Sequence, residues 1–305
     1  MGSAIISSMS LSIGIVGLPN SGKSTLFNAL LKRQIAQVGE YPYTTIEPNV
    51  GVVEVPDERL DKISEISGIT KKVPAGIKFI DIAGLIKNAH KGEGLGNKFL
   101  GHIREVDAIV HIVRAFDSSA SSGQAIPHVM SNIDPVRDIE VVNLELELAG
   151  IKKPAIYVLN VSESDLKRDF NLPFEYIKIS AKLEAELSDL SEKEQKEYLK
   201  ELGVSESALD QIILVSYKLL DLITLFTIAG GRQIQAWPIK KGTKATGAAE
   251  MVHTDFEKKF IKAEVVSFED FVSNNGWKGS REKGKTRIEG REYIVKDGDI
   301  MEFKI

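Results

Sequence analysis

The sequence predicts an α/β fold: a first domain with a mostly parallel sheet over residues 10–220, and a smaller α+β domain over residues 221–305. One observation predicts the first domain. Apolar runs rich in β-branched residues alternate with helical patterns as far as about Leu220, and apolar strands with helices between them form parallel sheets. A second observation predicts the second domain, because beyond Leu220 the strand-like pieces are punctuated by glycines.

The strands of the first domain are expected at its apolar runs. These are Ser12–Val16, Val50–Val53, Ile77–Ile82, Ala108–Val113 and Ala155–Leu159, with a weaker run at Tyr176–Ile179. Helical patterns occupy the intervals at Lys23–Leu31, Asp57–Ser67, Asn97–Val106 and Ile139–Leu148. Further helices are expected between residues 185 and 220, where Asp189 or Ser191, and then Ser205, can act as caps.

The second domain shows four strand-like pieces. They are Arg232–Trp237, Phe260–Val266, Glu292–Lys296 and Ile300–Ile305. The Lys-Asp-Gly-Asp sequence at 296–299 contains an Asp-Gly hairpin signal. Roughly 85 residues are enough for a domain that folds alone.

Composition limits the classes of protein that this chain can represent. Its 305 residues are 43% hydrophobic and 27% charged, which is ordinary for a globular protein of about two domains. The net charge of −4 provides no overall attraction to nucleic acid, so contact with RNA would need a local basic patch. The absence of cysteine excludes a disulfide framework and thiolate catalysis.

The sequence gives no sign of a membrane or secretory protein. No apolar run approaches the ~18–20 residues that span a bilayer. The start, MGSAIISSMSLSIGIVG, lacks the basic region and cleavage site of a signal peptide. We therefore expect a cytoplasmic protein.

A phosphate-binding motif follows the first strand. Gly17–Ser24, GLPNSGKS, matches G-x-x-x-x-G-K-[ST] and opens the first helix, which is the context in which this motif binds phosphates. Its backbone N–H groups and the helix N-terminus attract phosphate, Lys23 is expected to reach the β- and γ-phosphates, and Ser24 can bind Mg²⁺. The expected nucleotide contacts are Asn20, Ser21, Gly22, Lys23, Ser24 and Thr25.

A second motif, KFIDIAGL at Lys78–Leu85, ends another apolar strand. Asp81 falls at the ligand edge of the predicted sheet, where a carboxylate can hold Mg²⁺ through water. An ordinary strand-end cap is the alternative role for this residue. Gly84 can turn its N–H toward a γ-phosphate.

A third motif, YPYTTIEPN at Tyr41–Asn49, lies between the first helix and the second strand. A threonine in such a switch loop can ligate Mg²⁺ only when a third phosphate is present. Thr45 is the expected ligand, although the composition alone leaves Thr44 open.

These motifs resemble the nucleotide site of the Obg-like ATPases, the YchF subfamily of P-loop proteins. The similar segments are GLPNSGKSTLFNAL, YPYTTIEPN and DIAGLIKNAHKGEGLGNKFL. HTDFEKKFIKAEV and REYIVKDGDIMEFKI resemble the C-terminal TGS domain of that family, a β-grasp module. The resemblance spans nearly the whole chain, implies an ATPase, and matches Thr45 to the threonine of the switch loop.

The chain departs from the family pattern at one place. In the family an antiparallel helical hairpin follows the segment that resembles LELELAG. Here the chain passes from Gly150 through Ile151–Lys153 directly into the strand PAIYVLN. We expect this helical arm to be absent, which puts in doubt the partner contacts that the arm makes in the family.

The segment VLNVSESD, residues 158–165, bears on the choice of base. A guanine-binding loop would read Asn-Lys-x-Asp, whereas this chain has Asn160, Val161 and Glu163. Adenine presents a donor beside an acceptor, which a backbone N–H and carbonyl or the Asn160 amide can satisfy and a carboxylate cannot. The family pattern Asn-x-x-Glu goes with ATP, so we expect adenine; a degenerate guanine-binding loop is the alternative. Ser180 and Ala181 are expected to close the other side of the base pocket.

The group that orients the attacking water is not evident from the motifs. Leu85 occupies the position where many GTPases have glutamine, and leucine cannot form a hydrogen bond. His90 and His128 both lie in loops, and either could act or could simply be a solvated residue. The family resemblance singles out the histidine of an Ile-x-His-Val segment, which here is His128, as the catalytic residue.

Asn20 lies inside the phosphate loop, where its side-chain oxygen could help to bind a monovalent cation. Such a cation would neutralise charge that develops during hydrolysis. P-loop proteins with Pro-Asn at this place resemble potassium-stimulated members of the class, so K⁺ joins Mg²⁺ as an expected cofactor. A purely structural role, in which Asn20 braces the loop, is equally open.

The segment Trp277–Glu292 is expected to be a basic loop that could contact RNA phosphates. It contains six basic side chains, Lys278, Arg281, Lys283, Lys285, Arg287 and Arg291, against Glu282, Glu289 and Glu292. A solvated hairpin face is the simpler alternative, but TGS domains resemble RNA- or ribosome-associated modules.

The sequence as a whole predicts a Mg²⁺-dependent ATPase, cleaving the β–γ phosphoanhydride, that acts as a ribosome-associated switch. The expected partners are ATP and, through the TGS domain and the loop 278–291, the ribosome or RNA. Two alternatives remain open: an Obg-type GTPase, and a non-hydrolysing module whose RNA or ribosome binding is gated by ATP.

Overall fold

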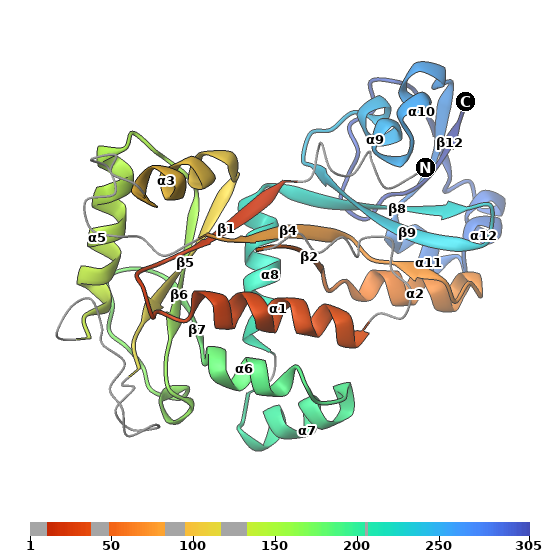
Figure 1. The fold of residues 1–305 in the computed structure, drawn as a ribbon. Coiled ribbons are helices and arrows are strands. Elements are labelled where there is room, and N and C mark those ends of the chain that lie inside the picture. The colour runs from red at the N-terminus through yellow and green to blue at the C-terminus, as the bar shows by residue number, and fades with distance from the viewer. Residues whose placement is uncertain (1–10, 38–48, 83–94, 117–132, 205–206) are drawn as a thin grey trace. The chain divides into compact units, whose positions relative to one another are not determined.

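The computed structural model describes residues 11–37, 49–82, 95–116, 133–204 and 207–305 (Figure 1). These residues form two compact units. Of the described residues, unit 1 contains those from 11 to 53 and Ile77–Leu219, and unit 2 contains Glu54–Gly76 and Leu220–Ile305. The step into unit 2 near residue 220 coincides with the expected domain boundary. The earlier segment Glu54–Gly76, however, belongs to unit 2 and not to the first domain, where the sequence had placed it.

Unit 1 is built on a six-stranded sheet in the order β2-β4-β1-β5-β6-β7. The described pairings of β1 with β4 and β5, of β5 with β6, and of β6 with β7 are parallel, which confirms a mostly parallel sheet. The expected strands are present to within a residue: β1 Ser12–Val16, β2 Val50–Glu54, β4 Gly76–Asp81, β5 Ala108–Arg114, β6 Ala155–Asn160 and β7 Tyr176–Ile179.

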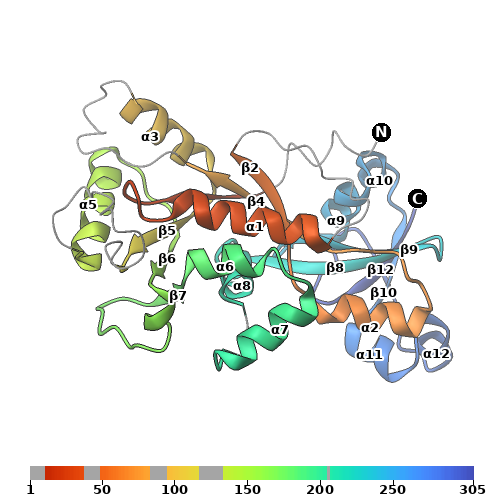
Figure 2. The same cartoon turned by 60° about the horizontal axis from the view of Figure 1, so that its bottom comes forward.

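The helices of unit 1 lie between and after these strands in the chain. They are α1 Lys23–Gln37, α3 Leu95–Glu105, α5 Pro135–Leu148, α6 Ala181–Leu187, α7 Glu192–Glu201 and α8 Ala208–Leu219, with a short 3₁₀ helix, η2, at Glu163–Asp165. Figures 1 and 2 show α1 and α6 side by side. Ser191 and Glu194 form a capping box at the start of α7, so of the two expected caps it is Ser191 that acts.

A buried cluster joins α3 and α5 to the sheet. Val16 of β1, Phe99 and Ile103 of α3, and Val142 and Leu146 of α5 all belong to it. α5 begins four residues earlier than expected because Asp134 caps it and Pro135 occupies its first turn.

The connection between α5 and β6 is short. The Gly150 N–H donates to Glu147 O and the Ile151 N–H to Leu146 O, both at 2.9 Å, and Gly150 has a left-handed φ of 67°. This Schellman arrangement ends a helix, and Ile151 turns into the α3–α5 cluster, where it is 7% exposed. No helical hairpin lies between α5 and β6, as the sequence predicted for this described part of the chain.

Unit 2 has a mixed sheet in the order β11-β10-β12-β8-β9-β3. Its strands are β3 Lys72–Val73, β8 Leu222–Ala229, β9 Gln233–Lys240, β10 Lys262–Val266, β11 Arg287–Glu289 and β12 Ile300–Lys304. Its helices are α2 Glu58–Ser67, α9 Ala245–Val252, α10 Thr254–Lys259, α11 Phe268–Ser273 and α12 Trp277–Glu282. The predicted α+β character of residues 221–305 is therefore present.

Two expectations for unit 2 were wrong. Glu292–Lys296 is not a strand, and only Ile294 forms an isolated bridge, with Lys244. The expected basic loop starts as the helix α12 and continues into β11.

Membrane-spanning helices are absent from the part of the chain that the structure describes, because none of its helices is both long and apolar enough.

Candidate functional site

The phosphate loop Gly17–Ser24 connects β1 to α1, as its sequence predicted. Gly22 has a φ of 102°, and a Cβ atom there would lie 2.3 Å from the Asn160 Nδ2 atom. Only glycine fits both the backbone conformation and this close approach. Asn20 also has a positive φ, 63°, and is exposed to solvent.

Lys23 lies within this loop with its ammonium group largely removed from solvent. The residue is 8% exposed, and its Nζ donates to Leu18 O at 2.9 Å. Burial lowers the pKa of Lys23, and the charge of Asp81 partly opposes that shift. A buried cation is costly unless an anion compensates it, so a phosphate group in the loop would be held strongly.

Ser24 and Asp81, the two predicted Mg²⁺ ligands that the structure describes, are in contact. Ser24 Oγ donates to Asp81 Oδ2 at 2.8 Å. The second carboxylate oxygen, Asp81 Oδ1, is buried and has no hydrogen-bond partner among the described residues. Buried polar atoms normally have partners, and Mg²⁺ takes one or two protein oxygens together with phosphates and waters. The residues therefore fit Mg²⁺.

Asn160 joins the phosphate loop to the loop after β7. Its Nδ2 donates to Ser21 O at 2.9 Å, its Oδ1 accepts from the Ala181 N–H at 3.0 Å, and the residue is 5% exposed. One Nδ2 hydrogen remains for a base. Asn160 thus holds the phosphate loop at Ser21 and the start of α6 at Ala181 in a fixed relation to each other.

The Val161 N–H is engaged within the sheet. It donates to Ile179 O at 2.8 Å, and the Val161 side chain is buried with Leu159, Val113 and Ile139. The parallel β6–β7 pairing therefore continues one residue past the end of β6. Only the Val161 carbonyl is left for a base edge.

Glu163 is exposed at the start of η2, where its Oε1 accepts from the Tyr198 hydroxyl at 3.4 Å. Tyr198 comes from α7, and no motif in the sequence pointed to it. Ser180 is the N-cap of α6, with its Oγ accepting from the Leu183 N–H. Ser180 and Ala181 are both buried, and the Ala181 N–H donates to the Asn160 amide oxygen.

Several predicted site residues lie outside the described residues. They are Thr45, Gly84 and His128, together with Leu85 and His90. Among the described histidines, His111 is 2% exposed in β5. Burial, and then the nearby charge of Lys23, lower the pKa of His111 to about 3, so this imidazole is neutral.

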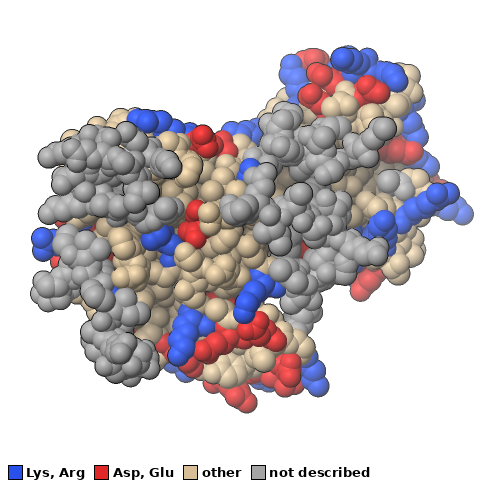
Figure 3. All heavy atoms as spheres, in the orientation of Figure 1, with Lys and Arg blue, Asp and Glu red and all other residues tan. Residues whose placement is uncertain are grey.

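The basic segment of unit 2 is largely paired within the unit. Arg281 forms ion pairs with Glu264 and Glu302, and Lys285 lies 3.2 Å from Asp270. Arg287 contacts Asp299 and Glu289, and Arg291 donates to backbone carbonyls. On the face shown in Figure 3, basic and acidic side chains of this unit lie close together. Within the described chain, Lys278 and Lys283 are the two basic residues of this segment that form neither an ion pair nor a side-chain hydrogen bond.

Comparisons with known proteins agree with this architecture. The family model described as 50S ribosome-binding GTPase matches residues 12–161, and the model of the YchF-type GTPase C-terminal region, described as a protein of unknown function, matches residues 222–305. The solved structure of the Schizosaccharomyces pombe YchF GTPase is 33% identical, with a TM-score of 0.82, and covers 97% of this chain and 98% of its own.

Curated relatives match over nearly their full length. The "Ribosome-binding ATPase YchF" of Bacillus subtilis is 41% identical, with 97% of this chain and 99% of that protein covered. "Obg-like ATPase 1" of Gallus gallus is 39% identical, with 97% and 92% covered. The Bacillus alignment extends over 370 positions against 305 residues here, so at least 65 residues of that relative have no counterpart in this chain.

This difference in length is in accord with the direct passage from α5 into β6. The identity and coverage of the relatives, the matching solved structure and the P-loop site lead to one assignment. The chain belongs to the YchF/Obg-like ATPase family.

Proposed function

We propose that this protein is a Mg²⁺-dependent ATPase that works as a ribosome-associated switch. The observation that carries the proposal is the contact between Ser24 and Asp81 beside the buried Lys23 ammonium. This arrangement supplies a phosphate-binding cation and two oxygen ligands at the end of one helix and one strand. The names of the relatives, ribosome-binding ATPase and Obg-like ATPase, support the same function.

Each of these residues has a distinct task in binding the triphosphate. The loop amides and Lys23 hold the β- and γ-phosphates, and Ser24 and Asp81 hold the metal. When bound, Mg²⁺ neutralises charge that builds up on the phosphate oxygens. Thr45 is proposed to complete the metal site in the triphosphate state, and the Gly84 N–H to contact the γ-phosphate.

ATP is proposed as the preferred nucleotide. The remaining Nδ2 hydrogen of Asn160 and the Val161 carbonyl are a donor and an acceptor, whereas Glu163 replaces the aspartate that reads guanine. A base that leaves buried polar groups unpaired is disfavoured roughly tenfold or more. Equal or tighter binding of GTP in a calorimetric titration would contradict this preference.

The proposed ribosome contact uses unit 2, which is proposed to be the TGS domain. Because four of the six basic residues at 278–291 are engaged within the unit, Lys278 and Lys283 are the residues proposed to contact RNA phosphates. Changing both to glutamate should weaken ribosome association and flatten its salt dependence. The charge reversal Lys285→Glu is a less specific test of RNA binding, because it also breaks the ion pair with Asp270.

A single-turnover experiment tests the enzymatic proposal. Excess enzyme is mixed with ATP and Mg²⁺, and phosphate release is followed with and without EDTA. We expect cleavage that needs Mg²⁺ and that Asp81→Asn and Ser24→Ala reduce strongly, while Ser164→Ala, an exposed serine change, leaves it intact. Tight ATP binding without any cleavage would instead identify a non-hydrolysing, ATP-gated binding module.

A monovalent cation is a further part of the proposal. Asn20 is proposed to provide one oxygen ligand for K⁺, which would offset the lack of a hydrogen-bonding side chain at Leu85. Turnover should then be faster in K⁺ than in Na⁺ at matched ionic strength, and Asn20→Ala should remove the difference. Equal turnover of the unaltered protein in both salts would leave Asn20 a structural residue.

A further inference from the structure

The chain leaves unit 1 and returns to it between β2 and β4. Residues Glu54–Gly76, with α2 and β3, are part of unit 2. Both flanking strands belong to the sheet that carries the nucleotide site. Unit 2 therefore includes the segment Glu54–Gly76, which is connected at one end to β2 and at the other end to β4.

The two flanking strands form an antiparallel ribbon. At one end the Asp81 N–H donates to Asn49 O at 2.9 Å, and at the other the Val55 N–H donates to Ala75 O at 2.8 Å. The apolar side chains along it are buried; Val53, Val55, Ile77 and Phe79 are between 0% and 4% exposed. Close-packed elements of this kind transmit displacement because they have little room to deform.

One end of the ribbon is the candidate metal site. Asp81 is the last residue of β4, pairs with Ile15 of β1 and accepts the Ser24 hydroxyl. A metal and a triphosphate that engage both Ser24 and Asp81 must act directly on this strand end. Gly76, where β4 begins, is only five residues away, roughly 17 Å along an extended strand.

The other end is anchored in the sheet of unit 2. β3 pairs with β9 through Lys72 with Ile234 and Val73 with Gln235. The Ile234 N–H also donates to Lys71 O at 2.9 Å. Val73 is 5% exposed. The segment Glu54–Gly76 therefore contributes, through β3, a buried strand to the sheet of unit 2.

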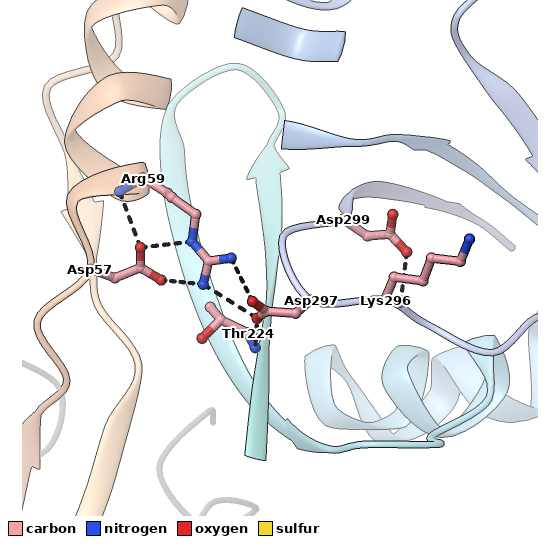
Figure 4. A network of polar contacts seen from close by, with 6 residues as sticks. All are labelled: Asp57, Arg59, Thr224, Lys296, Asp297 and Asp299. Atoms are coloured by element: carbon pink, nitrogen blue, oxygen red, sulfur yellow. Dashed lines mark hydrogen bonds and ion pairs between the residues drawn. The ribbon is translucent and has the colours of Figure 1, made fainter. Parts of the chain in front are cut away.

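A clamp of charged groups fixes α2 to the same unit. Figure 4 shows the Arg59 guanidinium between Asp57 and Asp297, with contacts of 2.8 Å to each carboxylate. Asp297 in turn accepts the Thr224 N–H of β8 at 2.8 Å. Arg59 also lies over the Phe226 ring, 5.4 Å from its centroid.

We propose that the β2–β4 ribbon and the Arg59 clamp couple nucleotide binding at Ser24 and Asp81 to the conformation of unit 2. The inference rests on the proposed function, because it assigns the regulation of that same site. Coupling between two sites is reciprocal, so a macromolecule that binds unit 2 also changes the affinity for nucleotide. The segment Glu54–Gly76 thus connects unit 2 covalently to β4, the strand that ends at Asp81.

Hydrogen exchange on the full chain tests the coupling. Exchange is compared without nucleotide and with a non-hydrolysable ATP analogue plus Mg²⁺, while calorimetry measures binding separately. We expect amides of α2, β3, β8 and β9 to change their exchange rates severalfold. Arg59→Ala should bind the analogue within about twofold of the original affinity but lose most of this response. Lys62→Ala, which removes an exposed ion pair with Glu65 on the same helix, is the matched control and should keep it.

Tryptophan emission gives a second readout. Both tryptophans of the chain, Trp237 and Trp277, lie in unit 2, so any change of emission caused by the analogue reports on this unit. Confirmed binding with no change in exchange or emission would overturn the coupling and leave the proposed function intact. A full response in folded Arg59→Ala would overturn the role of the clamp. Failure of the analogue to bind at all would overturn the proposed function and, with it, this inference.

Discussion

Asn160 is the residue on which most of the described nucleotide site depends. Its amide connects Ser21 of the phosphate loop to Ala181 at the start of α6. A single side chain therefore connects the phosphate loop to the N-terminus of α6. The residue type was predictable from its position after a buried strand, but these two partners lie 139 and 21 residues away in the chain.

Replacing Asn160 with alanine should cost both stability and affinity. The change leaves a buried carbonyl and a buried N–H without partners, so unfolding should be easier by about 2–4 kcal/mol, and ATP affinity should fall with it. Urea unfolding and calorimetric titration measure the two effects. Asn171→Ala is the control, because Asn171 is exposed. Unchanged stability in Asn160→Ala would contradict the bridging role.

His128 is the residue proposed to orient the attacking water. If it acts in the transition state, His128→Ala should lower kcat by roughly 10²-fold and leave ATP affinity nearly unchanged. Steady-state turnover and equilibrium binding of the same variant separate these effects. Full turnover in His128→Ala together with an inactive His90→Ala would transfer the role to His90.

At the scale of elements, the sequence predicted strands best where apolar runs are buried on both faces, as in β1 and β5. It failed at Glu292–Lys296, although Tyr293, Ile294 and Val295 have strand-forming side chains. There the buried Asp299 carboxylate accepts the Tyr293 hydroxyl at 2.7 Å and the Lys296 N–H at 2.9 Å, which bends the chain into a turn. Strand propensity judges each residue by its own side chain, so it does not register a carboxylate three and six residues further along the chain.

The contribution of the α5–β6 connection to stability can be tested at the two residues that end α5. Gly150 has a left-handed backbone, so Gly150→Ala should destabilise the protein by about 1 kcal/mol. Ile151→Ala should cost more, about 2–4 kcal/mol, because it leaves a cavity between α3 and α5. Thermal or urea unfolding measures both, with the exposed Lys152→Ala as control. Three equal unfolding midpoints would show that the connection tolerates any sequence.

At the scale of the whole molecule, the sequence located the start of the C-terminal segment but not the composition of unit 2. Helical periodicity predicted α2 correctly as an element. Its membership of unit 2 rests on contacts with distant parts of the chain. They include the two residue pairs between β3 and β9, the packing of α2 on β9 and α11, and the Arg59–Asp297 contact, which joins residues 238 positions apart. Neither local propensity nor the spacing of motifs carries that information.

A dissection of unit 2 tests this composition. A fragment of residues 220–305 alone lacks the β3 partner of β9 and the Arg59 partner of Asp297. A second fragment, in which residues 54–76 are joined to it through a flexible linker, regains both, together with buried Leu60, Ile63 and Val73. Because each fully buried aliphatic side chain stabilises by about 1.5–3 kcal/mol, the joined fragment should be more stable by about 3 kcal/mol or more. Urea unfolding compares the two, with a scrambled 54–76 sequence on the same linker as control. Identical unfolding midpoints for all three fragments would mean that residues 54–76 only lie against unit 2 and do not help to hold it together.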